Sequence, residues 1–421
     1  MTTLPQTVSI EPRRNLDCAI DIPGSKSCTA RALVMAMLTH GQSTLYQTAE
    51  CDDTDCMVAG IRGLGIPVAH KPETISVEGG ELRPPSAPLH LGNSGTAVRF
   101  LTAACAALNG TAVLDGVQRM RERPIGDLVE ALQHWGVEAE APKGCPPVTV
   151  RSTGRFGGQT RIRGAASSQY LTGLLLAAPR ATETAEIAVE GELVSKPYID
   201  LTLAMMRERG VEPQRDGYQR FTIPEDQQYE PGAYTIEADA SGASYFLAAA
   251  AIAGGRVRVN NLTTASHQGD AQFAHVLETM GCALEEGDGW MAVTGGDVLR
   301  GIDADLNAMP DMAQTLAVTA LFADSPTVIR NVGNLRIKEC DRLSATATEL
   351  RKLGAGVEEF EDGLRIIPWE WRAAAIDTYD DHRMAMSFAM AGLRIPGVTI
   401  NNPACVSKTF PDFFERFAQL T

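Results

Sequence analysis

Hydrophobic and polar positions along the chain repeat in a unit of about 70 residues that occurs six times. Each copy opens on small polar or acidic residues, continues into a helix rich in alanine and leucine, and then reaches a β-branched strand. The six openings lie at 24–27, 92–95, 166–169, 240–242, 310–311 and 380–382. Solenoid repeats are shorter, about 20–50 residues, so the pattern predicts six larger supersecondary units.

The pattern predicts two kinds of helix in these units. The first helix of each copy is apolar almost all round, which indicates burial; these helices are expected at 32–38, 100–108, 170–178, 245–253, 315–322 and 384–393. The second helix is amphipathic, as at 127–135, 200–209, 271–280 and 342–353. Five of the second helices precede a glycine of the kind that ends helices: Gly65, Gly136, Gly210, Gly281 and Gly354.

Each unit therefore reads β-α-β-α-β-β, an α/β fold in which three units around a pseudo-threefold axis form one lobe. Six units give two lobes, and 421 residues exceed the size of one ordinary core. We expect one lobe at 25–238 and a second, discontinuous lobe at 1–24 plus 239–421. The last copy lacks its closing strands, and an N-terminal strand at 9–22 is expected to complete its sheet.

Composition narrows the class of ligand and the compartment. The formal charge of −15 argues against nucleic acid and an anionic membrane surface as partners. The nine cysteines are scattered singly, which suits a reduced cytosolic protein. The first ten residues resemble neither a signal nor a transit peptide, and no apolar run reaches the length of a membrane span. We expect a cytoplasmic protein.

Polar side chains at the helix openings exceed what capping requires. One side-chain oxygen suffices for a cap, yet Ser167, Ser168 and Gln169 place three hydrogen-bonding groups at one opening. Free N–H groups and the helix dipole favour anions at such positions. The openings are therefore predicted to bind anions, except for the uncharged fourth opening at 241–244, which we expect to be structural.

Charged residues gather near the same openings. The cations include Lys26, Arg31, Arg123, Lys338, Arg342, Arg383 and Lys408, set against the carboxylates Asp311 and Glu339. Taken singly, these stretches also fit ordinary structural interpretations. Lys26 could be a solvated lysine beside a cap, the stretch at 120–126 a solvated charged loop, and His382 a histidine that caps its helix. Their recurrence at equivalent repeat positions favours a site. Arginine grips carboxylate and phosphate, so the set predicts two small anionic substrates and acid–base chemistry without metal or cofactor.

Several motifs resemble those of the 5-enolpyruvylshikimate-3-phosphate synthase family (3-phosphoshikimate 1-carboxyvinyltransferases), over essentially the whole chain. They are Gly-Ser-Lys-Ser at 24–27, Leu-Gly-Asn-Ser-Gly-Thr-Ala at 91–97, Arg-Glu-Arg-Pro-Ile-Gly at 121–126, Ser-Ser-Gln-Tyr at 167–170, Leu-Val-Ser-Lys-Pro-Tyr-Ile at 193–199, Lys-Glu-Cys-Asp-Arg at 338–342, Asp-His-Arg-Met-Ala-Met at 381–386 and Lys-Thr-Phe-Pro-Asp at 408–412. The resemblance implies a two-lobed inside-out α/β barrel that closes over its ligands. It also implies an enzyme of aromatic amino-acid biosynthesis, a target of glyphosate, that moves the enolpyruvyl group of phosphoenolpyruvate to the 5-hydroxyl of shikimate 3-phosphate. We expect this enzyme to be a monomer.

The same resemblance implies roles for individual residues. Shikimate 3-phosphate would be held by Lys26, Ser27, Arg31, Ser167, Ser168, Gln169, Ser195, Tyr198, Asp311, Asn334 and Lys338. Phosphoenolpyruvate would be held by Lys26, Asn93, Gly95, Arg123, Gln169, Arg342, Arg383 and Lys408. Asp311 would accept the proton of the 5-hydroxyl and Glu339 would protonate C3. Which of Glu339, Lys26 and His382 carries each proton in the elimination step stays open.

Three positions depart from the commonest form of the family motifs. Ala30 stands where asparagine is usual, Ser94 where alanine is usual, and Phe100 where proline is common. These changes leave the named ligand-binding residues intact, but they affect the helix that presents Gly95. We therefore predict reduced inhibition by glyphosate.

Two other functions compete with this one. A related enolpyruvyl transferase acting on UDP-N-acetylglucosamine generally carries a reactive cysteine or aspartate on a mobile loop, where this chain has 118–123 without cysteine. A non-catalytic repeat protein that merely binds anions would have no use for carboxylates placed among the cations. Both are less favoured than the shikimate enzyme.

Overall fold

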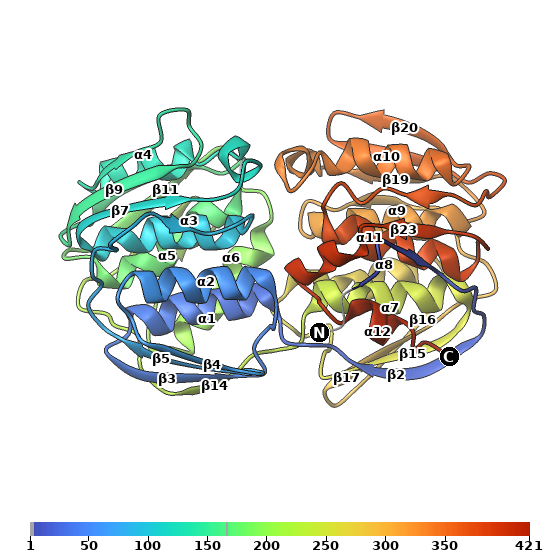
Figure 1. The fold of residues 1–421 in the computed structure, drawn as a ribbon, viewed down its shortest axis with the longest axis horizontal. Coiled ribbons are helices and arrows are strands. Elements are labelled where there is room, and N and C mark those ends of the chain that lie inside the picture. The colour runs from blue at the N-terminus through green and yellow to red at the C-terminus, as the bar shows by residue number, and fades with distance from the viewer. Residues whose placement is uncertain (1–3, 166) are drawn as a thin grey trace. The chain divides into compact units, whose positions relative to one another are not determined.

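A computed structural model describes residues 4–165 and 167–421. The chain divides into two compact units (Figure 1). Unit 1 combines the chain up to Pro23 with Glu237–Thr421, and unit 2 is Gly24–Ile236. None of the described helices combines the length and the apolar character that a membrane crossing requires.

Unit 2 contains three four-stranded sheets of the same topology. In order across the sheet, the first contains β14 (Ala233–Thr235), β3 (Gly41–Tyr46), β5 (Thr74–Gly79) and β4 (Val68–Lys71). The second contains β6 (Leu89–His90), β7 (Asn109–Asp115), β9 (Val148–Thr153) and β8 (Glu138–Glu140). The third contains β10 (Gly158–Arg163), β11 (Ala185–Glu190), β13 (Arg220–Ile223) and β12 (Gln214–Asp216). In each sheet the first two strands are parallel and the others antiparallel. This order confirms the β-α-β-α-β-β prediction.

Three apolar helices of unit 2 pack on one another: α1 (Lys26–Leu38), α3 (Gly95–Ala104) and α5 (Ser168–Ala177). They are buried along nearly their whole length, as their lack of a polar face predicts. The second helices are α2 (Asp52–Gly63), α4 (Gly126–His134) and α6 (Lys196–Arg207). Short 3-10 turns are η1 (Cys105–Ala107), η2 (Met120–Glu122) and η3 (Ala178–Arg180).

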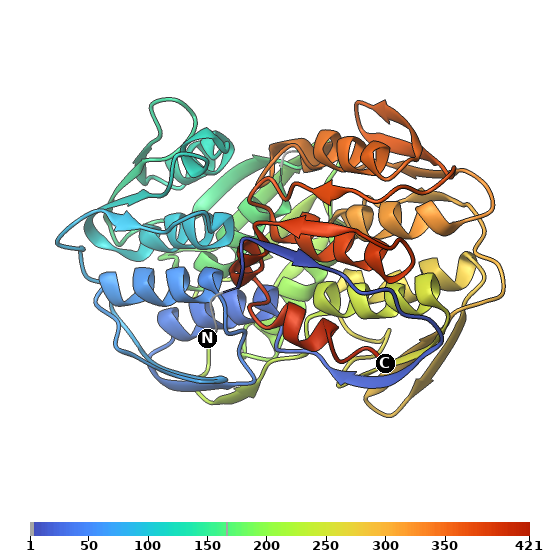
Figure 2. The same cartoon turned by 45° about the vertical axis from the view of Figure 1, so that its right-hand side comes forward.

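Unit 1 repeats this plan. Its sheets contain, in order, β2 (Leu16–Asp21), β15 (Gly255–Asn260), β17 (Trp290–Thr294) and β16 (Ala283–Gly287); β18 (Asp303–Asp305), β19 (Thr327–Arg330), β21 (Gly363–Ile367) and β20 (Gly356–Phe360); and β22 (Ala375–Ile376), β23 (Thr399–Asn401) and β1 (Thr7–Ser9). β1 runs antiparallel to β23 and lies beside the C-terminal elements in Figure 2.

The first helices of unit 1 are α7 (Ala240–Ala253), α9 (Ala313–Thr319) and α11 (His382–Ala389), and the others are α8 (Phe273–Thr279), α10 (Arg342–Lys352) and α12 (Phe413–Phe417). The 3-10 turns are η4 (Gly269–Gln272), η5 (Pro310–Met312), η6 (Ala320–Phe322), η7 (Gly333–Ile337), η8 (Met390–Leu393) and η9 (Pro403–Lys408). One hydroxyl from each first helix meets inside the unit: Thr315 lies 3.4 Å from both Ser244 and Ser387. The spacing of these three residues reflects the repeat.

Two predictions of local structure have clear outcomes. The five glycines all adopt positive φ, between 78° and 107°, and the N–H of each donates to the carbonyl three residues earlier, so their role as helix ends is confirmed. The single N-terminal strand predicted at 9–22 is wrong. It is two strands: β1 completes the sixth sheet, while β2 pairs in parallel with β15 in the fourth. Asn15, with φ of 54°, lies between them.

Candidate active site

Arg342 is the centre of a charge cluster in unit 1. Its side chain is 2% exposed and lies in the first turn of α10. It donates to Asp381 at 2.7 and 3.2 Å, to Glu339 Oε2 at 2.9 Å and to Asp311 Oδ1 at 3.1 Å. Burial alone lowers the pKa of Arg342, but the three carboxylates outweigh it and raise that pKa above its usual value. The guanidinium thus fixes both predicted proton-transfer carboxylates in one place.

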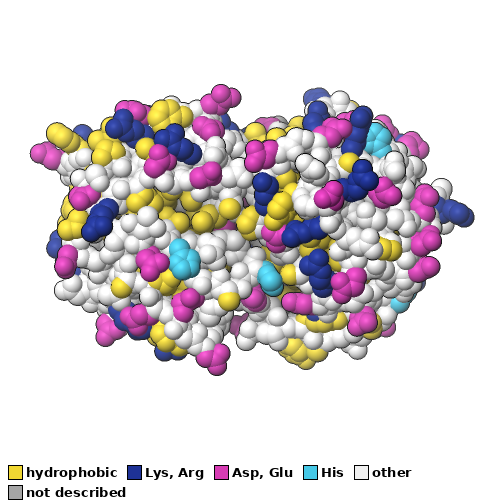
Figure 3. Space-filling model, turned by 180° about the vertical axis from the view of Figure 1, so that it is seen from behind, with side chains coloured by type: hydrophobic (Ala, Val, Ile, Leu, Met, Phe, Trp, Pro, Cys, Tyr) yellow, Lys and Arg dark blue, Asp and Glu magenta, His cyan; other side chains and the backbone are white. Residues whose placement is uncertain are grey.

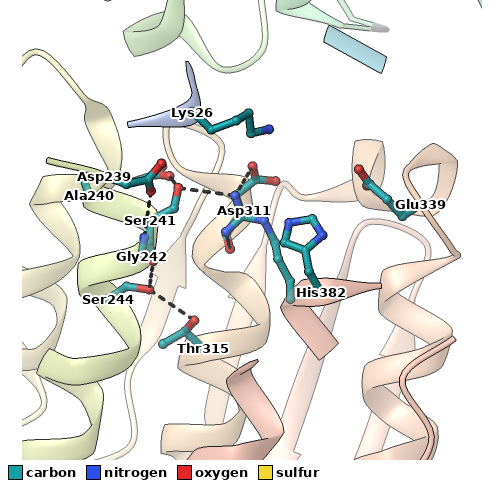
Figure 4. A network of polar contacts seen from close by, with 12 residues as sticks. Lys26, Asp239, Ala240, Ser241, Gly242, Ser244, Asp311, Thr315, Glu339 and His382 are labelled. Atoms are coloured by element: carbon teal, nitrogen blue, oxygen red, sulfur yellow. Dashed lines mark hydrogen bonds and ion pairs between the residues drawn. The ribbon is translucent and has the colours of Figure 1, made fainter. Parts of the chain in front are cut away.

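A second buried arginine, Arg383, reaches Asp311 from α11. Its Nη2 donates to Asp311 Oδ2 at 2.9 Å and to Ser241 Oγ at 3.3 Å, and its Nη1 donates to the hydroxyl of Tyr245 at 3.4 Å. Figure 4 shows Ser241 and Asp311 on neighbouring elements of unit 1. Ser241 belongs to the fourth opening, which was expected to be structural, and it contacts one of the predicted cations.

His382 begins α11 and is buried at 2% exposure. Asp381 caps this helix by accepting from the N–H of Arg383, so the alternative of a capping histidine is wrong. Both ring nitrogens lack a hydrogen-bond partner in the described part of the chain, and Nδ1 is 3.6 Å from Asp381 Oδ1, too far for a hydrogen bond. Burial first, and then the positive charge of Arg383, hold the pKa of His382 well below its usual value. The imidazole is therefore neutral at neutral pH.

Glu339 and Lys408 approach each other in the same cluster. Lys408 Nζ, 11% exposed, lies 3.8 Å from Glu339 Oε1, while Oε2 is held by Arg342. Asn334 lies on η7 and Lys338 directly follows this turn, and both precede α10. Asn334 Oδ1 is buried and has no hydrogen-bond partner among the described residues. Unit 1 therefore brings Asp311, Glu339, Arg342, Arg383 and Lys408 into one set of ion pairs.

Unit 2 places Lys26 and Arg31 on α1. Ser25 caps the helix by accepting from the N–H of Cys28. The ammonium group of Lys26 pairs with buried Asp53 at 3.4 Å. Arg31 is 3% exposed and donates to Thr202 Oγ1, to the carbonyl of Ser27 and to that of Tyr198 at 2.9–3.1 Å. Burial lowers the pKa of Arg31 to about 10. The hydrogen bonds described for this cation all go to uncharged oxygens.

Gly95 and Arg123 fit closely together at the start of α3. Ser94 caps this helix by accepting from the N–H of Ala97 at 3.4 Å. Arg123 is buried and donates to the carbonyl of Asn93 at 3.4 Å. A Cβ at position 95 would lie only 2.8 Å from Arg123 Nη2 and 2.9 Å from its Cζ. A side chain at position 95 would therefore displace this guanidinium from its place at the start of α3.

The third opening is linked to the second. Ser167 caps α5 by accepting from the N–H of Gln169, and Ser168 is buried. The amide of Gln169 accepts from Arg99 and donates to Thr96 Oγ1 at 3.2 Å.

The motif at 193–199 contains the start of α6. Ser195 is buried in a left-handed conformation with φ of 56°, which is rare for serine and typical of functional or tightly constrained positions. Its side chain makes no capping hydrogen bond to α6. Tyr198 lies in the first turn of the same helix and its carbonyl accepts from Arg31.

Some charges in the motifs belong to the surface instead. Arg121 is exposed and pairs with Asp115 at 2.6 Å, and Arg336 pairs with Asp341 and Glu359. On the face in Figure 3, acidic and basic side chains are likewise interspersed. The charged-loop interpretation of the stretch at 120–126 thus holds for Arg121.

Sequence reasoning missed three acidic residues: Asp53 and Asp381, which pair with Lys26 and Arg342, and Asp270, which is linked to Arg383 through Ser241. Asp381 lies within the quoted motif at 381–386, so its place directly before His382 and Arg383 was the available signal. Asp53 and Asp270 lie in second helical segments, outside the openings. Nothing in their local sequence marks them.

Carboxylates held among buried arginines and lysines define an acid–base enzyme for anionic substrates. The family model for EPSP synthase (3-phosphoshikimate 1-carboxyvinyltransferase) matches residues 10–417. The 3-phosphoshikimate 1-carboxyvinyltransferase of Shewanella denitrificans is 49% identical over 421 residues, with 98% of each chain covered, and that of Trichormus variabilis is 46% identical over 413 residues, with 97% covered. The solved EPSP synthase of Acinetobacter baumannii superposes with a TM-score of 0.83 at 25% identity, covering 99% of this chain and 98% of that one.

The chain therefore belongs to the EPSP synthase family. The predicted fold class and the predicted shikimate-pathway activity are confirmed, and neither the UDP-N-acetylglucosamine transferase nor the anion-binding scaffold is favoured.

Proposed function

We propose that this chain transfers the carboxyvinyl group of phosphoenolpyruvate to the 5-hydroxyl of shikimate 3-phosphate by addition and elimination, with Asp311 and Glu339 as the proton-transfer groups. Asp311 accepts the hydroxyl proton as the oxygen attacks C2, and Glu339 delivers a proton to C3. The resulting tetrahedral adduct loses a proton and expels phosphate, which leaves the enol ether.

The observation that carries this proposal is that Arg342 donates hydrogen bonds to both Asp311 and Glu339, at 3.1 and 2.9 Å. One buried guanidinium holds two carboxylates whose roles are opposite, an acceptor and a donor of protons. Positioned general acids and bases contribute about 10²–10⁴-fold each to rate. Neutral His382, buried among the same charges, is a further candidate to carry a proton in the elimination step.

Arg31 supports a binding site for shikimate 3-phosphate in unit 2. A buried charge is costly unless it is paired, and the described hydrogen bonds of Arg31 all go to neutral oxygens. A phosphate supplies the missing negative charge. The other residues proposed to hold this substrate are Lys26, Ser27, Ser167, Ser168, Gln169, Ser195 and Tyr198 in unit 2 and Asp311, Asn334 and Lys338 in unit 1.

The contact between Gly95 and Arg123 supports phosphoenolpyruvate binding at the start of α3. There the guanidinium lies beside Gly95, the first residue of α3, and a helix N-terminus favours an anion. Lys26, Asn93 and Gln169 in unit 2, and Arg342, Arg383 and Lys408 in unit 1, are the remaining residues proposed to hold this substrate.

Phosphate release tests the proposal directly. The purified protein is incubated with phosphoenolpyruvate and either shikimate 3-phosphate or UDP-N-acetylglucosamine, and phosphate is measured. Release only with shikimate 3-phosphate is expected, without added metal or cofactor. Release only with the nucleotide sugar, or with neither acceptor, contradicts the proposal. We further expect a monomeric, cytoplasmic enzyme without nucleic-acid or membrane partners, and light scattering checks the monomer.

A further inference from the structure

A buried carboxyl group, Asp270, lies behind Arg383 in unit 1. Asp270 belongs to η4 and is 4% exposed. Ser241 Oγ donates a hydrogen bond to Asp270 Oδ2 and accepts one from Arg383 Nη2 at 3.3 Å. The same Nη2 donates to Asp311 Oδ2 at 2.9 Å. Ser241 therefore connects Asp270 to the guanidinium that contacts the proposed base.

Ser241 is not needed to cap α7. Asp239 performs that role by accepting from the N–H of Gly242 at 2.8 Å (Figure 4). Because the cap is independent, Ser241 is available for the contact between Asp270 and Arg383. A purely structural explanation for the serine at this position is thereby weakened.

The turn that carries Asp270 is tied to the start of α7. Gln268 Oε1 accepts from the N–H of Ala240 at 3.2 Å, and its Nε2 donates to the carbonyl of Ala238 at 2.7 Å and to Glu237 at 3.1 Å. Asp270 and Ser241 are thus held at a fixed separation, as a group that orients another residue must be.

Charged groups face Asp270 from several elements: Asp311 from η5, Arg383 from α11 and Asp239 from the start of α7. Burial and then Asp311 raise the pKa of Asp270 to about 6, against the opposing effects of Arg383 and the Ser241 hydrogen bond. At neutral pH the ionised carboxylate accepts the Ser241 O–H, which leaves a lone pair of Ser241 for Arg383.

We infer that Asp270, acting through Ser241, is a positioning residue that fixes the Arg383 guanidinium for phosphoenolpyruvate binding. The inference rests on the proposed function of Arg383. Without this contact the guanidinium keeps Asp311 and Tyr245 as partners, but Nη2 loses Ser241 as its second acceptor, so the orientation of the guanidinium is less tightly fixed. Phosphoenolpyruvate affinity then falls, while the shikimate 3-phosphate site is unaffected.

Ser241→Ala and Asp270→Asn test the inference, with exposed Asp288→Asn as a control that removes the same charge from a hairpin tip. Steady-state kinetics of phosphate release are measured for both substrates at pH 5 and 7.5. Ser241→Ala and Asp270→Asn are expected to raise the KM for phosphoenolpyruvate about tenfold at pH 7.5, which corresponds to about 1.4 kcal/mol. The kcat and the KM for shikimate 3-phosphate should stay within about twofold of wild type.

The pH comparison separates positioning from a structural role. The difference in KM between wild type and Asp270→Asn should shrink at pH 5, where Asp270 is protonated in the wild type. Equal increases in both KM values, a change in kcat alone, or a KM ratio independent of pH overturns the inference. If Asp270→Asn does not fold, Ser241→Ala, which removes one oxygen atom, decides by the KM split. A wild type inactive with shikimate 3-phosphate refutes the proposed function instead.

Discussion

Replacing Asp311 by asparagine separates its proposed chemistry from its place in the charge cluster. The amide keeps the size of the carboxylate and one oxygen that can accept from an arginine, but it does not act as a base at neutral pH. Arg342 keeps Asp381 at 2.7 Å and Glu339 at 2.9 Å, and Arg383 keeps Ser241 and Tyr245 but loses its ion pair with Asp311. The substitution is therefore expected to leave the fold intact but to remove both the proton acceptor and one ion pair of Arg383, and saturating phosphoenolpyruvate separates the first effect from the second.

The expected loss follows from the role of a general base. Such groups contribute about 10²–10⁴-fold to rate, or about 2.7–5.4 kcal/mol of transition-state stabilisation at about 1.36 kcal/mol per factor of ten. We expect kcat for phosphate release with saturating phosphoenolpyruvate and shikimate 3-phosphate to fall by this factor. The melting temperature should stay close to that of the wild type.

Asp303→Asn is the matched control for this experiment. Asp303 also accepts two hydrogen bonds from one arginine, Arg330, at 2.7 and 2.8 Å, but it lies on the surface with its side chain 57% exposed. This variant should retain wild-type kcat. A kcat within about threefold of wild type for Asp311→Asn, with both substrates saturating, would refute the assignment of Asp311 as the base.

Four further predictions test other parts of the site. Gly95→Ala places a Cβ 2.8 Å from Arg123 Nη2 and should raise the KM for phosphoenolpyruvate about tenfold, whereas Gly80→Ala, with open space at its Cβ, should not. Arg31→Lys cannot reproduce the three-way contact of the guanidinium, so calorimetric titration should show weaker binding of shikimate 3-phosphate. Glyphosate should inhibit weakly, and an inhibition constant of micromolar order or lower, competitive with phosphoenolpyruvate, would contradict this. The folded pKa of Asp270, about 6, exceeds the unfolded value of about 3.9; the folded state therefore binds the extra proton between these values, and stability falls as pH rises through them. The melting temperature of Asp270→Asn relative to wild type should accordingly be higher at pH 7 than at pH 4.

Local pattern was sufficient to predict the repeated fold. Apolar helices, β-branched strands and glycine helix ends each depend on neighbours within a few residues, so their periodicity is visible in the chain. Gly65 and Gly354 adopt the expected positive φ for this reason. The N-terminal strands were different. β1 and β2 are both plausible strands locally, and only pairing with β23 and β15, far along the chain, assigns them to separate sheets.

Charge alone did not distinguish the site from the surface. Arg121 and Arg123 are two residues apart, yet the first is an exposed ion-pair partner and the second is buried against Gly95. The burial of each depends on how the loop packs.

The sequence by itself therefore determined the six units, the family and the helix N-termini at which anions are expected, because these follow from short-range periodicity and motif. The tertiary structure decided which charges meet. Arg31 finds Thr202 at a separation of 171 residues, and Arg383 finds Ser241 at 142. Such contacts arise when buried helices from distant repeats pack together, and the free energy of burying each charge depends on the partners that packing supplies.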